Sequence, residues 1–162
     1  KENFRNGKYL WVTPTDITSN KYVKDTGRKL TEQGLKNGRI ISENSVLVTC
    51  IASIGKNSIL KEKGSCNQQI NAITPNKSHL TEFIYYLIEN NSDKLKLYAS
   101  ITATPILNKK SFENMKFIFP SRNEQEKIAY FLSAIDSKRE KLSKYLEINE
   151  EFKKGLLQQM FC

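Results

Sequence analysis

Apolar and polar residues follow one unbroken pattern over the last 40 residues of the chain. From Asn123 onward, positions at intervals of seven hold Ile128, Ile135, Leu142, Asn149 and Leu156. The positions three residues further on include Phe131, Tyr145 and Phe152. A seven-residue repeat sustained over four heptads is typical of a coiled coil, in which the repeated residues face a partner helix. The pattern predicts one helix from about residue 124 to residue 160.

The predicted pairing surface of this helix includes residues beside the two heptad positions. We expect it to consist of Ile128, Phe131, Leu132, Ile135, Leu142, Tyr145, Asn149, Phe152 and Leu156. Asn149 either fixes the register of the pair at a cost in stability, or is a solvent-exposed interruption near the helix end. At about 1.5 Å per residue the helix would be roughly 55 Å long, too long to bury its apolar face on one small domain. We therefore expect it to pair with a second helix.

A boundary precedes this helix. Pro120 ends the segment before it, and Ser121 with Glu124 has the spacing of a capping box, in which each residue satisfies a free amide of the first helical turn. The sequence therefore predicts two domains, residues 1–122 and residues 123–162.

Before the boundary the pattern changes every few residues, which predicts short elements of both kinds. Strands are expected at residues 9–12, 45–51, 57–60, 69–74 and 116–119. Helices are expected at residues 30–37, 80–90, 93–99 and 108–115. This alternation is typical of an α+β fold. We expect a small mixed β-sheet with short helices, followed by one long C-terminal coiled-coil helix.

The net charge of +9 belongs entirely to the first domain. Residues 123–162 contain 7 basic and 7 acidic residues, so residues 1–122 contain 19 basic and 10 acidic ones. A positive surplus confined to one domain favours a nucleic acid partner, because each neutralised phosphate releases counterions. The candidate phosphate or guanine contacts are Lys21, Lys24, Arg28, Lys29, Lys36 and Lys56. A solvated basic surface would have the same composition.

Three consecutive amides, Asn67, Gln68 and Gln69, are candidates for base contacts. Asn and Gln present a donor and an acceptor together, which suits bidentate hydrogen bonding to adenine in the major groove. The alternative is that these amides satisfy the backbone of their own loop.

Other chemistry has little support in the sequence. Cys50, Cys66 and Cys162 have no metal-ligand spacing and favour a reducing cytoplasm, and His79 is the only histidine. We find no glycine-rich phosphate loop, methyltransferase motif or nuclease-like acidic cluster, and no apolar run long enough to span a membrane. We therefore expect no catalytic residues, no metal site and no cofactor.

Several motifs resemble the specificity subunits of Type I restriction–modification systems. The segments are 11–17 (WVTPTDI), 46–56 (VLVTCIASIGK), 67–71 (NQQIN), 105–108 (PILN), 124–132 (EQEKIAYFL) with Asp136, and 153–161 (KKGLLQQMF). They cover nearly the whole chain in the family's order. The sequence departs from the family at Ser121, where a second proline is common. The family's recognition domain usually begins earlier than the Trp11 motif, so we expect an N-terminal part of the domain to precede this sequence.

The resemblance implies a function for each part of the chain. The first domain would be a target-recognition domain that reads one half of a split sequence in double-stranded DNA. The long helix would be a spacer that packs against the other spacer helix of the subunit, or against a second copy, and so sets the gap between half-sites. Modification subunits would methylate adenine, and a restriction subunit would cleave. The chain would itself be non-catalytic, and its ending favours the distal half of a subunit.

Two alternatives remain open on the sequence alone. The chain could be a coiled-coil scaffold whose basic domain binds an acidic protein, or a small cytoplasmic enzyme that uses Cys50 or Cys66. Salt-sensitive, sequence-selective DNA binding would exclude the scaffold, and DNA binding after thiol alkylation would exclude the enzyme.

Overall fold

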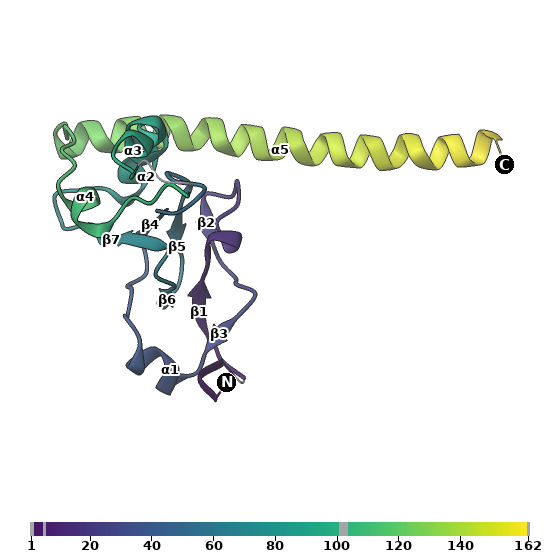
Figure 1. The fold of residues 1–162 in the computed structure, drawn as a ribbon. Helices are drawn as coiled ribbons and strands as arrows, with labels where there is room; N and C mark the ends of the chain where they lie inside the picture. The colour runs from purple at the N-terminus through teal and green to yellow at the C-terminus, as the bar shows by residue number, and fades with distance from the viewer. Residues whose placement is uncertain (1, 5, 101–103, 162) are drawn as a thin grey trace.

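The chain folds into a layered domain attached to one very long helix (Figure 1). The computed structural model describes residues 2–4, 6–100 and 104–161. The long helix α5 (Arg122–Phe161) runs along one side of the domain and continues far beyond it. The overall class is α+β with a long C-terminal helix, as the sequence predicts.

The sheet nearest α5 has four strands in the order β2-β5-β4-β7, namely β2 (Tyr22–Val23), β5 (Asn57–Leu60), β4 (Val46–Thr49) and β7 (Ile70–Ile73). Strand β4 pairs antiparallel with β5 and β7, whereas β2 runs parallel to β5. Every residue of β4 and β5 is buried, which explains the continuous apolar run of β4.

A second sheet lies farther from α5 and has three strands in the order β3-β1-β6. They are β3 (Lys29–Leu30), β1 (Tyr9–Val12) and β6 (Gly64–Cys66), with β1 antiparallel to β3 and parallel to β6. A side chain at Gly64 would come within 2.5 Å of the Leu10 carbonyl, so this close pairing requires glycine. One apolar cluster, including Leu10 and Val12 from β1 and Leu47 from β4, joins the two sheets.

Short helices complete the domain. The 3-10 helix Glu2–Phe4 and helix α1 (Glu32–Asn37) lie at the end farthest from α5, and the 3-10 helix Pro14–Asp16 follows β1. Helices α2 (Thr81–Asn90), α3 (Ser92–Leu97) and α4 (Lys109–Glu113) lie near the four-stranded sheet. A second apolar cluster packs α2 residues such as Ile84 and Ile88 against Val46 and Ile59. Helix α2 therefore forms the layer between the sheet and α5.

The structure differs from the predicted fold in three details. The segment 116–119 forms no strand: Phe117 packs against the core, whereas Ile118 is 91% exposed and β7 pairs only with β4 among the described residues. The helix expected from residue 30 begins at Glu32, because Leu30 belongs to β3 and the Thr31 side chain accepts the Gly34 amide as an N-cap. The single predicted sheet is two small mixed sheets, since β2, β3 and β6 are two or three residues long and carry no periodic signal.

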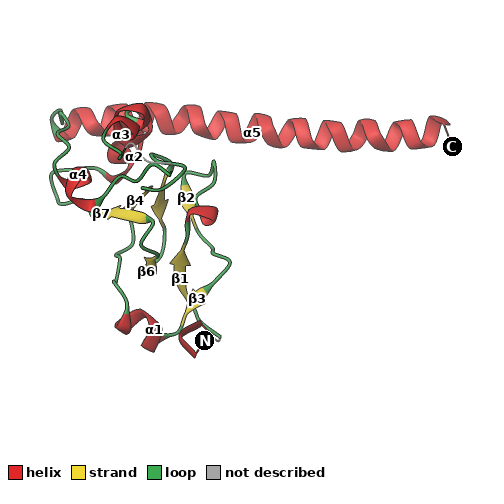
Figure 2. Cartoon of the chain, in the orientation of Figure 1, coloured by secondary structure: helices red, strands yellow, loops and turns green. Residues whose placement is uncertain are grey.

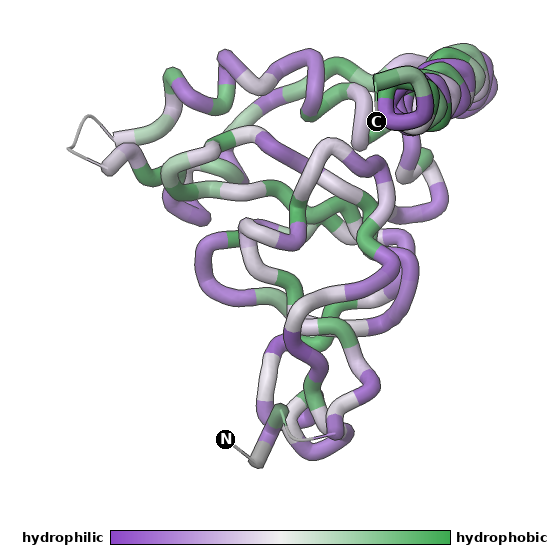
Figure 3. Tube along the Cα trace, turned by 90° about the vertical axis from the view of Figure 1, so that its right-hand side faces the viewer, coloured by the Kyte–Doolittle hydropathy of each residue, from purple (hydrophilic) through white to green (hydrophobic). Residues whose placement is uncertain are grey.

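Helix α5 has 40 residues and, at about 1.5 Å per residue, a length of roughly 60 Å. Its first amides are capped at Ser121, whose hydroxyl and carbonyl both accept the Glu124 amide. Its early turns pack on the domain, and from Ser137 onward every described residue except Gly155 is exposed. Figure 3 shows α5 end-on, beside the domain and not within it. Among the described residues, no helix is apolar over a long enough stretch to cross a membrane.

Candidate nucleic-acid interface

The amide turn, Asn67 to Gln69, connects β6 to β7. The Asn67 side chain accepts the Gln69 amide and donates to Gln69 Oε1, both at 3.0 Å. These two side chains therefore stabilise their own turn, as in the alternative given above. Gln68 is exposed, and its side chain has no hydrogen-bond partner among the described residues. Gln68 is thus the member of the turn best placed to contact a ligand.

The ends of several strands surround the amide turn. The Asn67 amide donates to the Val12 carbonyl at the end of β1, and the Cys50 amide donates to the Gln69 carbonyl just after β4. On the other side of β4, the Thr49 hydroxyl donates to the carbonyls of Ser53 and Lys56 and so stabilises the turn before β5. The fold therefore brings the exposed Lys56 to the same end of the four-stranded sheet as the amide turn.

The basic residues between 24 and 36 lie between the end of β2 and the end of α1: Lys24 and Arg28 are in the segment that joins β2 to β3, Lys29 is in β3 and Lys36 is in α1. Lys24 and Arg28 are exposed. Lys29 pairs with Asp25 at 2.8 Å and Lys36 with Glu32 at 3.1 Å, and both pairs are solvent-exposed. Exposed pairs of this kind contribute little to stability because water and salt screen them, so phosphates could replace the carboxylates. Lys8, Arg39, Lys61 and Lys63 are further exposed basic residues of the domain.

Lys21 has a different environment from the other predicted basic contacts. Its ammonium donates to Tyr86 Oη at 3.0 Å and to Ser133 Oγ at 2.8 Å, and lies 4.4 Å from the centre of the Tyr86 ring. Burial lowers the pKa of Lys21, and the carboxylates of Glu82 and Asp136 partly oppose this effect. The structure thus directs Lys21 into the contact between the domain and α5, so we no longer propose it as a DNA contact.

The junction between the domain and α5 was not foreseen from the sequence. Gln125 is 1% exposed; its side chain accepts the Leu80 amide at 2.9 Å and donates to the carbonyls of Pro120 and Ser78. One turn further on, Ala129 is also buried. A signal was available in α2, where Phe83, Ile84, Tyr85, Tyr86 and Ile88 are all buried. A helix that is apolar on nearly all sides packs on two neighbours, here the sheet and α5.

The buried phenol of Tyr85, in α2, predicts how stability changes at alkaline pH. Burial, then the charges of Glu89 and Asp136, raise the Tyr85 pKa to about 12. Because this folded-state pKa lies above the ordinary value near 10, the protonated phenol stabilises the fold fully below about pH 10. This stabilisation is lost as the pH rises through about 12. In tyrosinate absorbance titrations, the difference between wild type and Tyr85→Phe should have its midpoint near pH 12; a midpoint near 10 would contradict the burial argument.

The predicted helix-pairing residues divide into two groups. Leu132 and Ile128 are partly buried, and Leu132 packs against the domain core. The remaining apolar members are 41% to 66% exposed: Phe131, Ile135, Leu142, Tyr145, Phe152 and Leu156. Asn149 is exposed, and its amide donates to the Tyr145 carbonyl one turn earlier. We call this exposed group, with Asn149, the free stripe of α5.

The free stripe and the domain occupy different sides of the helix. Successive residues of an α-helix are rotated by about 100°, which places the free stripe roughly 150° around the axis from Gln125 and Ala129. A second helix can therefore pack on the free stripe without displacing the domain. Figure 1 shows that the part of α5 beyond the domain is open along its length.

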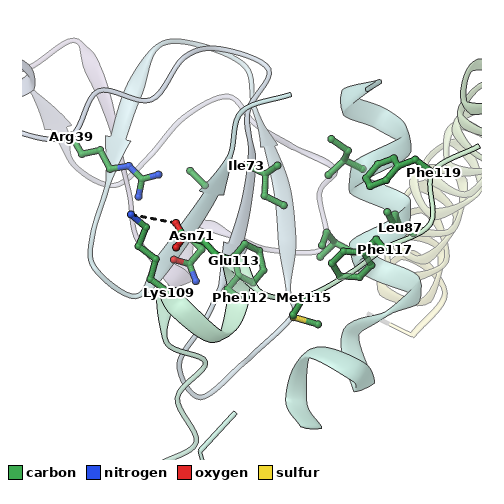
Figure 4. Close-up of a pocket in the computed structure, with 13 residues that line it drawn as sticks. Arg39, Asn71, Ile73, Leu87, Lys109, Phe112, Glu113, Met115, Phe117 and Phe119 are labelled. Atoms are coloured by element: carbon green, nitrogen blue, oxygen red, sulfur yellow. Dashed lines mark ion pairs between the residues drawn. The ribbon is translucent and has the colours of Figure 1, made fainter. Parts of the chain in front are cut away.

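The described residues contain no group of three or more His, Cys, Asp or Glu side chains that could hold a metal ion. Cys50 and Cys66 are buried, and burial raises the pKa of both thiols, that of Cys66 to about 11. Thiols in such surroundings are poor nucleophiles. A pocket of about 340 Å³ lies between β7, α2 and the segment around α4. It is mainly apolar, with Arg39 and the Lys109–Glu113 ion pair at one side (Figure 4).

Known proteins share this sequence and architecture. The chain is 30% identical over 161 residues to the MjaIX specificity subunit of a Type I restriction enzyme from Methanocaldococcus jannaschii; the match covers 96% of this chain and 37% of that subunit. The fold is similar to a chain in a structure of a type I R-M system, with a TM-score of 0.68, 16% identity, and coverage of 84% and 33%. It is also similar to the HsdS subunit from Thermoanaerobacter tengcongensis, with a TM-score of 0.63, 16% identity, and coverage of 82% and 30%.

The chain spans about a third of the length of the curated relatives that it matches. The family model for the Type I restriction modification DNA specificity domain matches residues 1–152, which include the whole globular domain and most of α5. Sequence and fold thus agree, and the chain belongs to the family of Type I restriction modification DNA specificity domains.

Proposed function

We propose that this chain recognises one half of a split target in double-stranded DNA, as part of a Type I restriction–modification specificity subunit. The observation that carries the proposal is a cationic domain that presents the exposed Gln68, with the exposed Lys56 at the same end of the four-stranded sheet, and that is attached to a helix bearing the free stripe. The relatives support it, because they are named specificity subunits of Type I restriction enzymes. Recognition would reside in this chain and catalysis in its partners.

Under this proposal the contacts have separate roles. Lys24, Arg28, Lys29, Lys36 and Lys56 would bind phosphates and hold the domain on the duplex. Gln68 would contact base edges, while Asn67 and Gln69 hold the turn that presents it. Phosphate contacts provide affinity and base contacts provide sequence preference.

The position of the free stripe supports a bipartite target. We propose that α5 pairs antiparallel with the other spacer helix, or with a second copy. A two-fold axis relating antiparallel helices is perpendicular to the plane that contains both, so it keeps each domain on the same side of that plane. Because the domain lies roughly 150° from the stripe, about 30° short of the opposite side, both domains would lie on one side of that plane and could contact one duplex.

Residues 1–122 would be the target-recognition domain and residues 123–162 the spacer. The protein partners would be modification subunits, which methylate adenine, and a restriction subunit. The chain would act in the cytoplasm, where duplex DNA is accessible. No step of the proposal requires a cofactor on this chain.

The base and phosphate roles are tested by two substitutions. Gln68→Ala should change which bases are preferred, with a cost of about 1–3 kcal/mol on the preferred sequence. Lys24→Ala or Lys29→Ala should weaken binding to every sequence similarly and reduce the slope of log affinity against log salt by about 1. Fluorescence anisotropy over a salt series measures both effects.

Lys154→Ala is the matched control, since this exposed lysine lies near the far end of α5 and should leave the base preference unchanged. Equal losses on all sequences for Gln68→Ala and Lys24→Ala would contradict the assignment of Gln68. Binding with neither sequence preference nor salt dependence would favour the scaffold alternative.

A further inference from the structure

The domain is attached to α5 at two separate places. The first is Gln125, whose side chain bonds the Leu80 amide and the Ser78 carbonyl, directly before α2. The second is a polar cluster around Tyr86, which reaches Ser133 and Asp136. Gln125 and Asp136 are 11 residues apart, which corresponds to roughly 16 Å along the helix axis. One attachment point would leave the domain free to pivot, whereas two fix its direction.

Three chain segments meet in the polar cluster. Tyr86, in α2, donates its hydroxyl proton to Asp136 Oδ2 at 2.5 Å and accepts from the Lys21 ammonium at 3.0 Å. Lys21, just before β2, also donates to Ser133 Oγ at 2.8 Å. The cluster therefore links the four-stranded sheet, α2 and α5 through directional hydrogen bonds.

The surroundings strengthen these bonds. Tyr86 is only 9% exposed, and the Lys21 ammonium lies against its ring as well as its hydroxyl. Charge-assisted hydrogen bonds are stronger than neutral ones, and partial burial reduces their screening by water. The apolar contacts nearby, through Ala129 and Leu132, carry no comparable directional preference. At this second attachment, the directional contacts therefore come from the polar cluster.

We propose that Lys21, Tyr86 and Asp136 are positioning residues that set the angle between the recognition domain and α5. The inference rests on the proposed function for its biological meaning, since that angle would set the distance between two half-sites. From Asp136 to Phe161 the helix extends by roughly 38 Å, so a tilt of about 10° moves its far end by roughly 6 Å. This is nearly two base-pair steps, at about 3.4 Å each.

The angle can be measured without DNA. Spin labels at Lys36→Cys in α1 and Lys154→Cys in α5, in a Cys162→Ser background, report the distance between the domain and the far helix; the other cysteines are buried. The distance is measured by pulsed electron paramagnetic resonance. Diluting the labelled chains with unlabelled ones removes the contribution of distances between copies. The wild type should give one narrow distribution. Tyr86→Phe and Lys21→Met should broaden or shift it by several Å, whereas Lys21→Arg should preserve it more closely.

Tyr130→Phe is the matched control, because Tyr130 lies on α5 but is 79% exposed, and it should give the wild-type distribution. Asp136→Asn tests the cluster from the α5 side should Tyr86→Phe fail to fold. A wild-type distribution in folded Tyr86→Phe and Asp136→Asn variants would overturn the proposal.

A second experiment selects the duplexes that the protein binds from a pool of random DNA sequences. Tyr86→Phe should retain the wild-type half-site but accept gaps that differ by one or more base pairs; an unchanged single gap would overturn the link to spacing. If the wild type enriched no half-site, the proposed function would fail, and the distance measurement would still decide the role of the polar cluster.

Discussion

Replacing Leu142 by aspartate is expected to prevent the proposed pairing of α5 with a second helix. Leu142 lies in the middle of the free stripe and is 64% exposed in the single chain. In an antiparallel pair it would be buried, and burying a leucine contributes roughly 1.5–3 kcal/mol. A symmetric pair loses two leucines and gains two unpaired charges, so the dissociation constant should rise at least about 100-fold. Sedimentation equilibrium on the purified chain measures it.

Ser143→Asp is the matched control for this prediction. It introduces the same charge at the next residue, which is exposed and rotated by about 100° away from the stripe. We expect its dissociation constant to stay within about threefold of the wild type, since surface substitutions usually change free energies by less than 0.5 kcal/mol. Equal association of Leu142→Asp and wild type would show that the stripe is not the pairing surface.

Gln125→Leu should have the largest effect on the stability of the domain. Leucine has nearly the same size but cannot bond the Leu80 amide or the carbonyls of Pro120 and Ser78. Each buried polar group left without a partner costs about 1–3 kcal/mol. We expect a loss of about 3 kcal/mol, because some of these groups will recruit water. This corresponds to a drop in Tm of roughly 6–12 °C.

Gln158→Leu, on the exposed far part of α5, provides the comparison. It makes the same chemical change without a buried partner and should alter the free energy of unfolding by less than about 0.5 kcal/mol. Thermal unfolding followed by circular dichroism measures both variants. A Tm for Gln125→Leu within about 2 °C of the wild type would mean that the Gln125 hydrogen bonds do not hold the junction.

The long helix and the longer strands were predictable because their patterns are periodic. The heptad positions of α5 and the apolar run in β4 are properties of contiguous sequence. Strands such as β3 and β6 were not predictable, because two or three residues contain no full period and pair with β1 across long sequence separations. The segment 116–119 has strand-like composition, but within the described part of the chain no strand lies beside it to pair with it.

The candidate site was predictable as residue types but not as an arrangement. The amide turn can be read from Asn67, Gln68 and Gln69, yet only the fold shows that two of them bond each other and leave Gln68 exposed. Lys21 resembles the other basic residues in the sequence. Its position between Tyr86 and Ser133 depends on contacts made 65 and 112 residues away, which no local pattern encodes.

We propose that one domain recognises a short DNA sequence while a rigid pair of helices fixes its distance from a second recognition domain. Selection of a random DNA duplex pool by the purified chain tests both parts together. If two copies pair antiparallel through α5, the two-fold axis predicts an inverted repeat of one short motif, separated by a single fixed gap. Sequencing that shows no enriched motif, or one motif with no second copy at a constant distance, would contradict the claim.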